Sequence, residues 1–439
     1  MPAETRMMME KTDVLGTLRA GELAGATRLD LAGCGLTGVP REGFDLADSL
    51  GVLNLSQNRL QNLPDELATL GRLKILFGSD NQFTKVPEVV GACPALSMVG
   101  FKANAIEEVP AECLPKHLRW LILTDNQVAE LPKQLGGCAA LQKLMLSGNR
   151  LERLPEEMAG CVNLELVRLA SNRFKRLPEW LLKLPKLAWL AVAGNPCSAT
   201  PDAVGEAGLE EVAWGTLELK EKLGEGASGL IYRALRSDGT EVAVKVFKGA
   251  VTSDGLPENE MKASIAAGRH AHLIKVLGKV KGHPQGMEGL VMALLDSKYR
   301  NLAGPPSFES CTRDVYGEDL RLERRQVIAM ARAMASVAMQ LHGRGLMHGD
   351  FYAHNMVWDG EEGCLLGDFG GASFYDPEVT GVSLERLEVR AFGCLMEELL
   401  DRCVDEGGPG LRELQRRCLD GDVAGRPRFG EILEALDAR

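Results

Sequence analysis

One asparagine that recurs at a nearly constant interval organises the first half of the chain. It stands at position 58 in segment 53–60 (LNLSQNRL), and its equivalents follow after 23, 23, 22, 23, 23 and 23 residues. They are Asn81, Asn104, Asn126, Asn149, Asn172 and Asn195, with Cys34 in the same slot one interval earlier. A proline follows six residues after nearly every one of these positions. A fixed period of this length indicates stacked structural units, here eight of them.

The residue pattern within each unit explains why the units must stack. Leucines at alternate positions direct their side chains into one narrow core, and the asparagine amide can pair with backbone groups where the chain turns after a short strand. One unit buries too little apolar surface alone, so stability comes from contacts between neighbours. The pattern resembles a leucine-rich-repeat solenoid of the 23-residue kind. We expect a helical N-terminal cap over residues 13–24 and the end of the array at Asn195-Pro196.

Strand residues that flank the core leucine point to the concave side of such a solenoid, because side chains alternate along a strand. These positions lie six and four residues before each recurring asparagine, and many of them are apolar. The largest are Phe77, Trp120, Ile122, Met145 and Trp189. An exposed apolar face favours a protein partner or substrate. Two alternatives stay open: the residues pack on each other or on the second half of this chain, or the patch has no role.

Four short segments follow one another in the second half of the chain. They are 224–229 (GEGASG), 242–245 (VAVK), 348–350 (HGD) with Asn355 five residues later, and 368–370 (DFG). The glycines lie between two β-like stretches, which predicts a hairpin rather than a turn into a helix. Each segment alone is a weak signal, but the series in this order and spacing is specific.

The series resembles a eukaryotic-type protein kinase from about residue 216 to the C-terminus. The resemblance implies catalytic roles for Asp350, as acceptor of the substrate hydroxyl proton, and for Lys245, as the cation on the ATP phosphates. A glutamate would orient Lys245; Glu258 and Glu260 compete, and spacing favours Glu260. The metal ligands for Mg²⁺ or Mn²⁺ would be Asn355 and Asp368.

The same resemblance predicts the remaining ATP-binding positions. Their side chains or backbone would contact the phosphates or the adenine ring. They are Gly224, Gly226, Gly229, Ile231, Ala243, Lys245, Ala293 and Leu295. Segment 290–295 would be the strand that enters the hinge, with Met292 as gatekeeper.

Three departures from the kinase pattern restrict the prediction. Gly349 stands where the family carries an arginine that reads a phosphorylated activation loop, and Tyr352 stands where Ser/Thr kinases carry a lysine. Only twenty residues separate Asp368 from Glu388, and no Ala-Pro-Glu follows. We expect Asp376 or Glu385 to pair with Arg426 instead. The phosphate acceptor is therefore less defined than ATP binding.

Composition limits the compartment and the partners. The net charge is −11, without a basic stripe, which argues against nucleic acid and anionic membranes as partners. The eleven cysteines show no metal-binding or disulfide spacing. No segment predicts a secretory signal or a membrane span. We therefore expect a cytoplasmic protein with free thiols.

The predicted fold is an α/β leucine-rich-repeat solenoid at 1–200, a linker at 201–215, and an α+β two-lobed protein kinase-like domain at 216–439. The predicted function is an ATP-dependent protein kinase, Ser/Thr-directed or autophosphorylating, with repeats that bind protein. The alternative is an ATP-binding scaffold without appreciable transfer, in which the repeats carry the function.

Overall fold

A computed structural model of the chain describes residues 13–198, 209–405 and 408–438. The chain divides into two compact units, Met1–Leu164 and Glu165–Arg439. The second unit thus contains the last two repeat strands as well as everything that follows them. This division differs from the expected domain boundary after residue 200, because those two strands pack with the second half of the chain.

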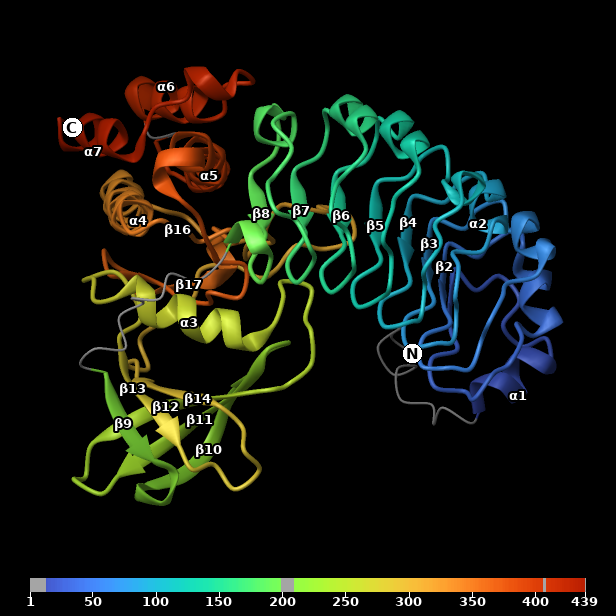
Figure 1. Cartoon of the computed structure of the whole chain (residues 1–439), viewed down its shortest axis with the longest axis horizontal. Helices are drawn as coiled ribbons and strands as arrows, with labels where there is room; N and C mark the ends of the chain where they lie inside the picture. The colour runs from blue at the N-terminus through green and yellow to red at the C-terminus, as the bar shows by residue number, and fades with distance from the viewer. Residues whose placement is uncertain (1–12, 199–208, 406–407, 439) are drawn as a thin grey trace. The chain divides into compact units, whose positions relative to one another are not determined.

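The first unit is a stack of parallel strands in one register, in which successive repeats pair residue for residue (Figure 1). The strands are β1 Arg28–Asp30, β2 Val52–Asn54, β3 Ile75–Phe77, β4 Met98–Gly100, β5 Trp120–Ile122 and β6 Lys143–Met145. Helix α1 spans Asp13–Arg19 and precedes the first strand, where the cap was expected. Short helical turns follow the strands; they include α2 Val89–Ala92 and 3-10 turns at Arg41–Leu46, Asp65–Thr69, Ala111–Cys113, Lys133–Gly137 and Glu156–Gly160.

The recurring asparagines connect neighbouring repeats through their amides. Asn58 donates to the carbonyls of Leu31 at 2.9 Å and Leu55 at 2.8 Å, and its own carbonyl accepts from the amide of Leu36 at 2.9 Å. Asn81 and the later asparagines make equivalent bonds. These bonds satisfy backbone groups that the turn would otherwise bury unpaired. The central leucine of the strands is buried, as in Leu53.

The large apolar residues on the strand face of the first unit are half-buried and contact each other. The Nε1 of Trp120 lies 3.3 Å from the sulfur of Met145, and the Nζ of Lys143 lies 4.2 Å from the centre of the Trp120 ring. Phe77 and Ile122 close over Gly100, where an added Cβ would lie 2.7 Å from the Phe77 ring. The face is therefore partly covered by its own side chains.

The second unit begins with the last two repeat strands, β7 Leu166–Arg168 and β8 Trp189–Ala191, which pair in parallel. Trp189, expected on a surface open to partners, is only 2% exposed. Its ring stacks on Tyr352 at 4.3 Å between centroids and with a 7° interplanar angle. For this residue the partner surface was a wrong prediction, and the alternative of packing on the same chain holds.

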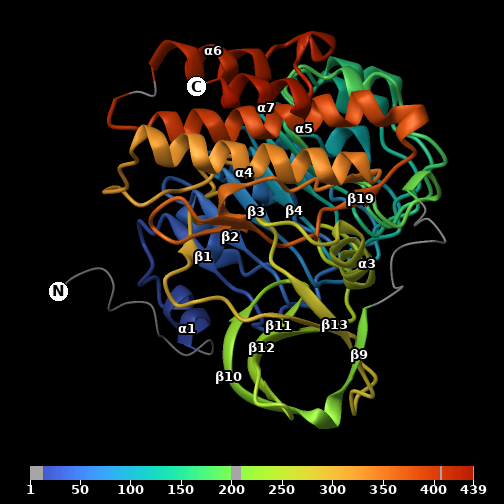
Figure 2. The same ribbon diagram turned by 90° about the vertical axis from the view of Figure 1, so that its left-hand side faces the viewer.

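The first lobe of the kinase-like region is a curved sheet in the order β10-β11-β12-β14-β13-β9 (Figure 2). Its strands are β10 Leu217–Glu225, β11 Gly229–Arg236, β12 Glu241–Phe247, β13 Val276–Lys281, β14 Gly289–Ala293 and β9 Glu210–Ala213. Strand β9 lies in the segment expected as a linker and pairs in parallel with β13 through the buried Val212. The rest of that linker, 201–208, lies outside the described residues. Helix α3, Pro257–Ala267, follows β12.

The second lobe is helical, and α4 Arg324–Gly343 and α5 Pro377–Leu400 lie side by side in it (Figure 2). Helices α6 Gly408–Cys418 and α7 Phe429–Asp437 pack against them. The motif loops are carried by short pairs of strands. Strand β17 Met356–Trp358 pairs with β15 Arg300–Asn301 and with β18 Cys364–Leu366, and β16 Leu346–Met347 pairs with β19 Ser373–Phe374. Among the described residues, no helix is both long enough and apolar enough to cross a bilayer.

The short segment after Asp368 becomes helical almost at once. Asp376 accepts a hydrogen bond from the amide of Glu378 at 2.9 Å, and Pro377 occupies the first turn, both of which favour a helix start. The expected pairing of Glu385 or Asp376 with Arg426 was wrong.

Glu385 pairs with Arg428 at 2.7 Å instead. The guanidinium of Arg426 donates to the backbone carbonyls of Pro185, Arg386 and Asp420. Because it already has these acceptors, the buried guanidinium is satisfied without a carboxylate.

Candidate active site

Lys245 and Glu260 form an ion pair in the first lobe. Lys245 lies on β12, and Glu260 lies in the first turn of α3, where Pro257 suits the helix start. Glu260 is buried, whereas Glu258 pairs with Lys262 on the exposed face of the helix. Of the two competing carboxylates, Glu260 is thus the one that contacts Lys245. Burial raises the pKa of Glu260, against the opposing charge of Lys245.

The glycine-rich segment forms the predicted hairpin between β10 and β11, closed by a 2.9 Å bond from the Gly226 amide to the Gly229 carbonyl. A Cβ at Gly224 or Gly226 would meet no atom within 4 Å, so backbone there is open to a ligand. A Cβ at Gly229 would lie 2.6 Å from the Val246 carbonyl, so this glycine permits the close approach of β12.

The predicted adenine positions lie on three neighbouring strands. Ile231 pairs with Lys245 across β11 and β12, and Ala243 pairs with Met292 across β12 and β14. Strand β14 ends at Ala293, so Leu295 follows the strand. The Ala293 amide already donates to the Lys275 carbonyl at 2.9 Å. That amide is therefore not a free donor for adenine.

The loop between β16 and β17 holds Asp350 and Asn355 together. The Nδ2 of Asn355 donates to both the carbonyl and the carboxylate of Asp350, each at 2.9 Å. His348 is fully buried, and its Nε2 lies 3.1 Å from the Gly367 carbonyl, which links this loop to the segment that carries Asp368. His348 therefore supports the loop rather than facing a ligand.

Glu388 anchors the same loop from helix α5. Its carboxylate accepts from the amide of Gly349 at 2.7 Å and the amide of His348 at 3.3 Å, and it lies 2.8 Å from Nε2 of His342. Burial opposes its ionisation, but these bonds outweigh burial and lower the pKa of Glu388. Glu388 lies 39 to 40 residues from these two loop residues in sequence, so only the tertiary contacts reveal this role.

Close contacts at the glycines link each of the four motif segments to the next. The Cε of Lys245 is 3.4 Å from where a Gly229 Cβ would lie, which connects the hairpin to β12. A Cβ at Gly370 would lie 4.0 Å from Oε2 of Glu260, and one at Gly371 would lie 2.9 Å from the Cβ of Asp350. The structure therefore places Gly229 beside Lys245, Gly370 beside Glu260 and Asp368, and Gly371 beside Asp350.

Two residues that were not predicted as site residues join this cluster. Arg168, on β7, forms ion pairs with Asp350 and with Asp254, which lies in the loop before α3. Burial, together with the charges of Asp350 and Asp368, raises the pKa of Asp254 despite Arg168. The available sequence signal was that Arg168 is one of two basic residues among the strand-face positions, the other being Lys143.

The cluster has the charge and donor chemistry for a nucleotide and a hard divalent ion. Carboxylates outnumber cations in it, since Asp254, Glu260, Asp350 and Asp368 face Lys245 and Arg168. Mg²⁺ takes one or two protein oxygen ligands together with water and phosphate oxygens, which the Asn355 amide and Asp368 carboxylate could supply. Among the described residues no group of three or more His, Cys, Asp or Glu side chains is arranged to hold a metal by itself.

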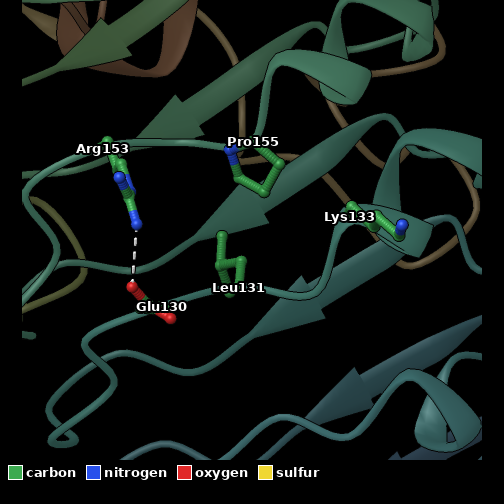
Figure 3. Close-up of a pocket in the computed structure, with 5 residues that line it drawn as sticks. All are labelled: Glu130, Leu131, Lys133, Arg153 and Pro155. Atoms are coloured by element: carbon green, nitrogen blue, oxygen red, sulfur yellow. Dashed lines mark hydrogen bonds and ion pairs between the residues drawn. The ribbon is translucent and has the colours of Figure 1, made fainter.

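Surface hollows elsewhere among the described residues include the following two. One is on the repeats of the first unit, where Arg153 and Glu130 pair at 3.0 Å beside Leu131, Lys133 and Pro155 (Figure 3). Both partners of that pair are well exposed, so the pair contributes little free energy. The other hollow lies between α3 and the β12 end of the sheet. Neither includes Lys245, Asp350 or Asp368.

Comparison with known families agrees with this arrangement. Residues 217–389 match the protein kinase domain family. Residues 116–174 and 140–196 match the leucine rich repeat family. The kinase match covers the glycine hairpin, the lysine strand, the loop with Asp350 and the segment with Asp368.

Curated relatives resemble parts of the chain. The phosphorylase b kinase gamma catalytic chain (liver/testis isoform) of Bos taurus is 27% identical over 197 residues, 44% of this chain and 45% of the relative. A probable LRR receptor-like serine/threonine-protein kinase of Arabidopsis thaliana is 27% identical over 230 residues, which cover 45% of this chain and 36% of the relative. The leucine-rich repeat and calponin homology domain-containing protein 1 of Mus musculus is 30% identical over 126 residues, which cover 28% of this chain and 18% of the relative. The chain spans less than half the length of each. The chain therefore carries leucine-rich repeats followed by a protein kinase domain.

Proposed function

We propose that the chain is an ATP-dependent protein kinase that transfers phosphate to a serine or threonine hydroxyl, on itself or on another protein. The observation that carries the proposal is the pairing of Lys245 with Glu260 beside the glycine hairpin, next to Gly370 of the segment that holds Asp368, whose Gly371 in turn lies against Asp350. This proximity of distant chain positions supports phosphoryl transfer, which depends on positioned charges.

Each side chain then has one task. Lys245, oriented by Glu260, neutralises phosphate charge, and Asn355 with Asp368 would hold Mg²⁺ or Mn²⁺, which would supply further charge neutralisation. Asp350 orients the acceptor hydroxyl and takes its proton. The hydroxyl oxygen bonds to the γ-phosphorus of ATP while the bond from that phosphorus to the bridging oxygen breaks, and ADP leaves. Positioning and electrostatics supply the rate.

Labelled ATP with Mg²⁺ or Mn²⁺ tests the proposal. Wild type is expected to label itself or a generic protein acceptor, and Lys245→Ala and Glu260→Gln are expected to lose about 10²-fold in rate, because each removes charge or its orientation at the phosphates. Glu258→Gln, on the exposed face of α3, is the matched control and should stay near wild type. Binding of ATP without transfer by wild type would contradict the kinase and support the scaffold.

We further propose that the half-buried apolar face of the first unit binds a protein partner. It consists of Phe77, Trp120, Ile122 and Met145, and apolar faces rich in aromatic residues are favoured at protein interfaces. Trp120→Ala with Met145→Ala is expected to remove partners that co-purify with the chain, at unchanged folding. Val162→Ala, an exposed apolar residue off this face, is the control. An unchanged set of partners in the double variant would contradict the proposal.

A further inference from the structure

Arg168 reaches from a repeat strand into the loop that holds Asp350. Its Nε donates to Oδ1 of Asp254 at 2.6 Å, its Nη1 donates to the Gly349 carbonyl at 3.0 Å, and its Nη2 pairs with Asp350. Its side chain is 3% exposed. Three donors with three fixed acceptors hold a buried guanidinium in one orientation.

The adjacent repeat is joined to the same loop and to β19 by buried hydrogen bonds. The Nε1 of Trp189 on β8 donates to the Phe351 carbonyl of the loop at 3.3 Å, and the amide of Val192, just after β8, donates to Oγ of Ser373 on β19 at 2.9 Å. Both pairs are buried. Separation of the repeat strand from the loop would leave these buried donors and acceptors without their hydrogen bonds, which costs free energy. The contact is therefore part of the folded second unit.

The kinase loop itself lacks the cation that the Ser/Thr pattern implies. Tyr352 stands at that position, and it is buried against Trp189. Arg168, on repeat strand β7, places a positive charge beside the Asp350 carboxylate of this loop. Burial disfavours an ionised Asp350, but the charge of Arg168, together with His354, His348 and the hydrogen bond from Asn355, lowers the pKa of Asp350 below its usual value.

We infer that Arg168 is a positioning residue of the phosphoryl-transfer site, which fixes the Asp350 carboxylate and supplies the positive charge that the kinase loop lacks. The inference rests on the proposed function. Arg168 and Asn355 each take part of the hydrogen-bonding capacity of Asp350, but a carboxylate has about four lone-pair sites. The Asp350 side chain also remains 16% exposed, so an acceptor hydroxyl has both a free site and a route.

The transfer rates of Arg168→Ala and Arg168→Lys test this inference. Arg168→Ala is expected to lower kcat about 10²-fold at unchanged KM for ATP, because it acts on Asp350 rather than on the nucleotide. Arg168→Lys should recover part of the rate, since it keeps the charge without the three-donor fork. The matched control is Arg173→Ala, exposed in the same repeat, which should match wild type. A circular-dichroism spectrum and an unfolding midpoint show whether each variant folds.

The split between kcat and KM separates positioning from mere structural support. Loss of a positioning residue lowers kcat at unchanged KM for ATP and at an unchanged unfolding midpoint, and the conservative Arg168→Lys restores part of kcat. A residue that only supports the fold would change the unfolding midpoint and KM as well.

Each outcome decides between the readings. Equal kcat in Arg168→Ala and wild type would overturn the inference, and a higher kcat would show that the contact is inhibitory. If Arg168→Ala unfolds, Arg168→Lys still decides, because a folded lysine variant with the wild-type kcat would overturn the role of the guanidinium. Absence of transfer by wild type would instead refute the proposed function itself, and the inference with it.

Discussion

Gly349→Ala is expected to destabilise the second unit strongly, by about 3–5 kcal/mol. Gly349 has φ +70°, where an alanine costs roughly 1–2 kcal/mol. The larger part comes from packing, because a Cβ there would lie 2.3 Å from the Gly371 carbonyl and 2.5 Å from the Leu190 carbonyl. Both obstacles are backbone atoms, so strand β8 or the loop must move. The thermal unfolding midpoint measures the effect.

Gly239→Ala is the matched control for this prediction. Gly239, in the turn between β11 and β12, has φ +82°, and a Cβ there would meet nothing within 4 Å. The Gly239→Ala substitution should therefore lower the free energy of unfolding only by the cost of a positive φ for alanine, roughly 1–2 kcal/mol. Similar midpoints for the two variants would mean that β8 does not press on the loop in solution.

The same close approach explains why the loop lacks the arginine of the kinase pattern. Any side chain at position 349 would extend from a Cβ that already collides with β8 and with Gly371. The glycine and the docked repeat strand are therefore two parts of one arrangement. The positive charge at the loop is supplied by Arg168, which donates to the Gly349 carbonyl and pairs with Asp350.

Asp350→Asn is expected to lower kcat about 10³-fold, because an amide cannot take the proton of the acceptor hydroxyl. The amide has nearly the same shape, and its oxygen can still accept from Arg168 or Asn355, so the fold and ATP affinity should persist. Transfer of labelled phosphate and binding of a fluorescent ATP analogue measure the two properties separately.

Asp238→Asn makes the same chemical change in an exposed turn and should leave both properties unchanged. Transfer by Asp350→Asn at the wild-type rate would contradict the role of Asp350 as proton acceptor.

Local pattern predicted much of this structure. The strand-face positions counted from the recurring asparagines are the two ends of the observed strands, as in Val52 and Asn54 of β2. This works because each repeat repeats the same contacts with its neighbour. The glycine hairpin and the strand with Lys245 were also predictable, since both are defined by nearby residues.

Contacts between distant segments were not predictable in the same way. Nothing near Trp189 in sequence indicates that its ring stacks on Tyr352, and nothing near Arg168 indicates its contact with Asp350. Strand β9 was expected to be part of the linker because its four residues, Glu210–Ala213, include one buried side chain, Val212, and show no apolar pattern of a strand. In each case the deciding partner lies far along the chain.

Rescue of Arg168→Ala by added guanidinium ion tests most directly whether the repeats complete the kinase site. Removal of the side chain leaves a space lined by the Asp254 and Asp350 carboxylates and the Gly349 carbonyl, which suits this cation. The rate of phosphate transfer by Arg168→Ala is predicted to rise and saturate with millimolar guanidinium, while wild type and Arg173→Ala do not respond. A variant rate that is insensitive to guanidinium, or that already equals or exceeds the wild-type rate, would contradict the account.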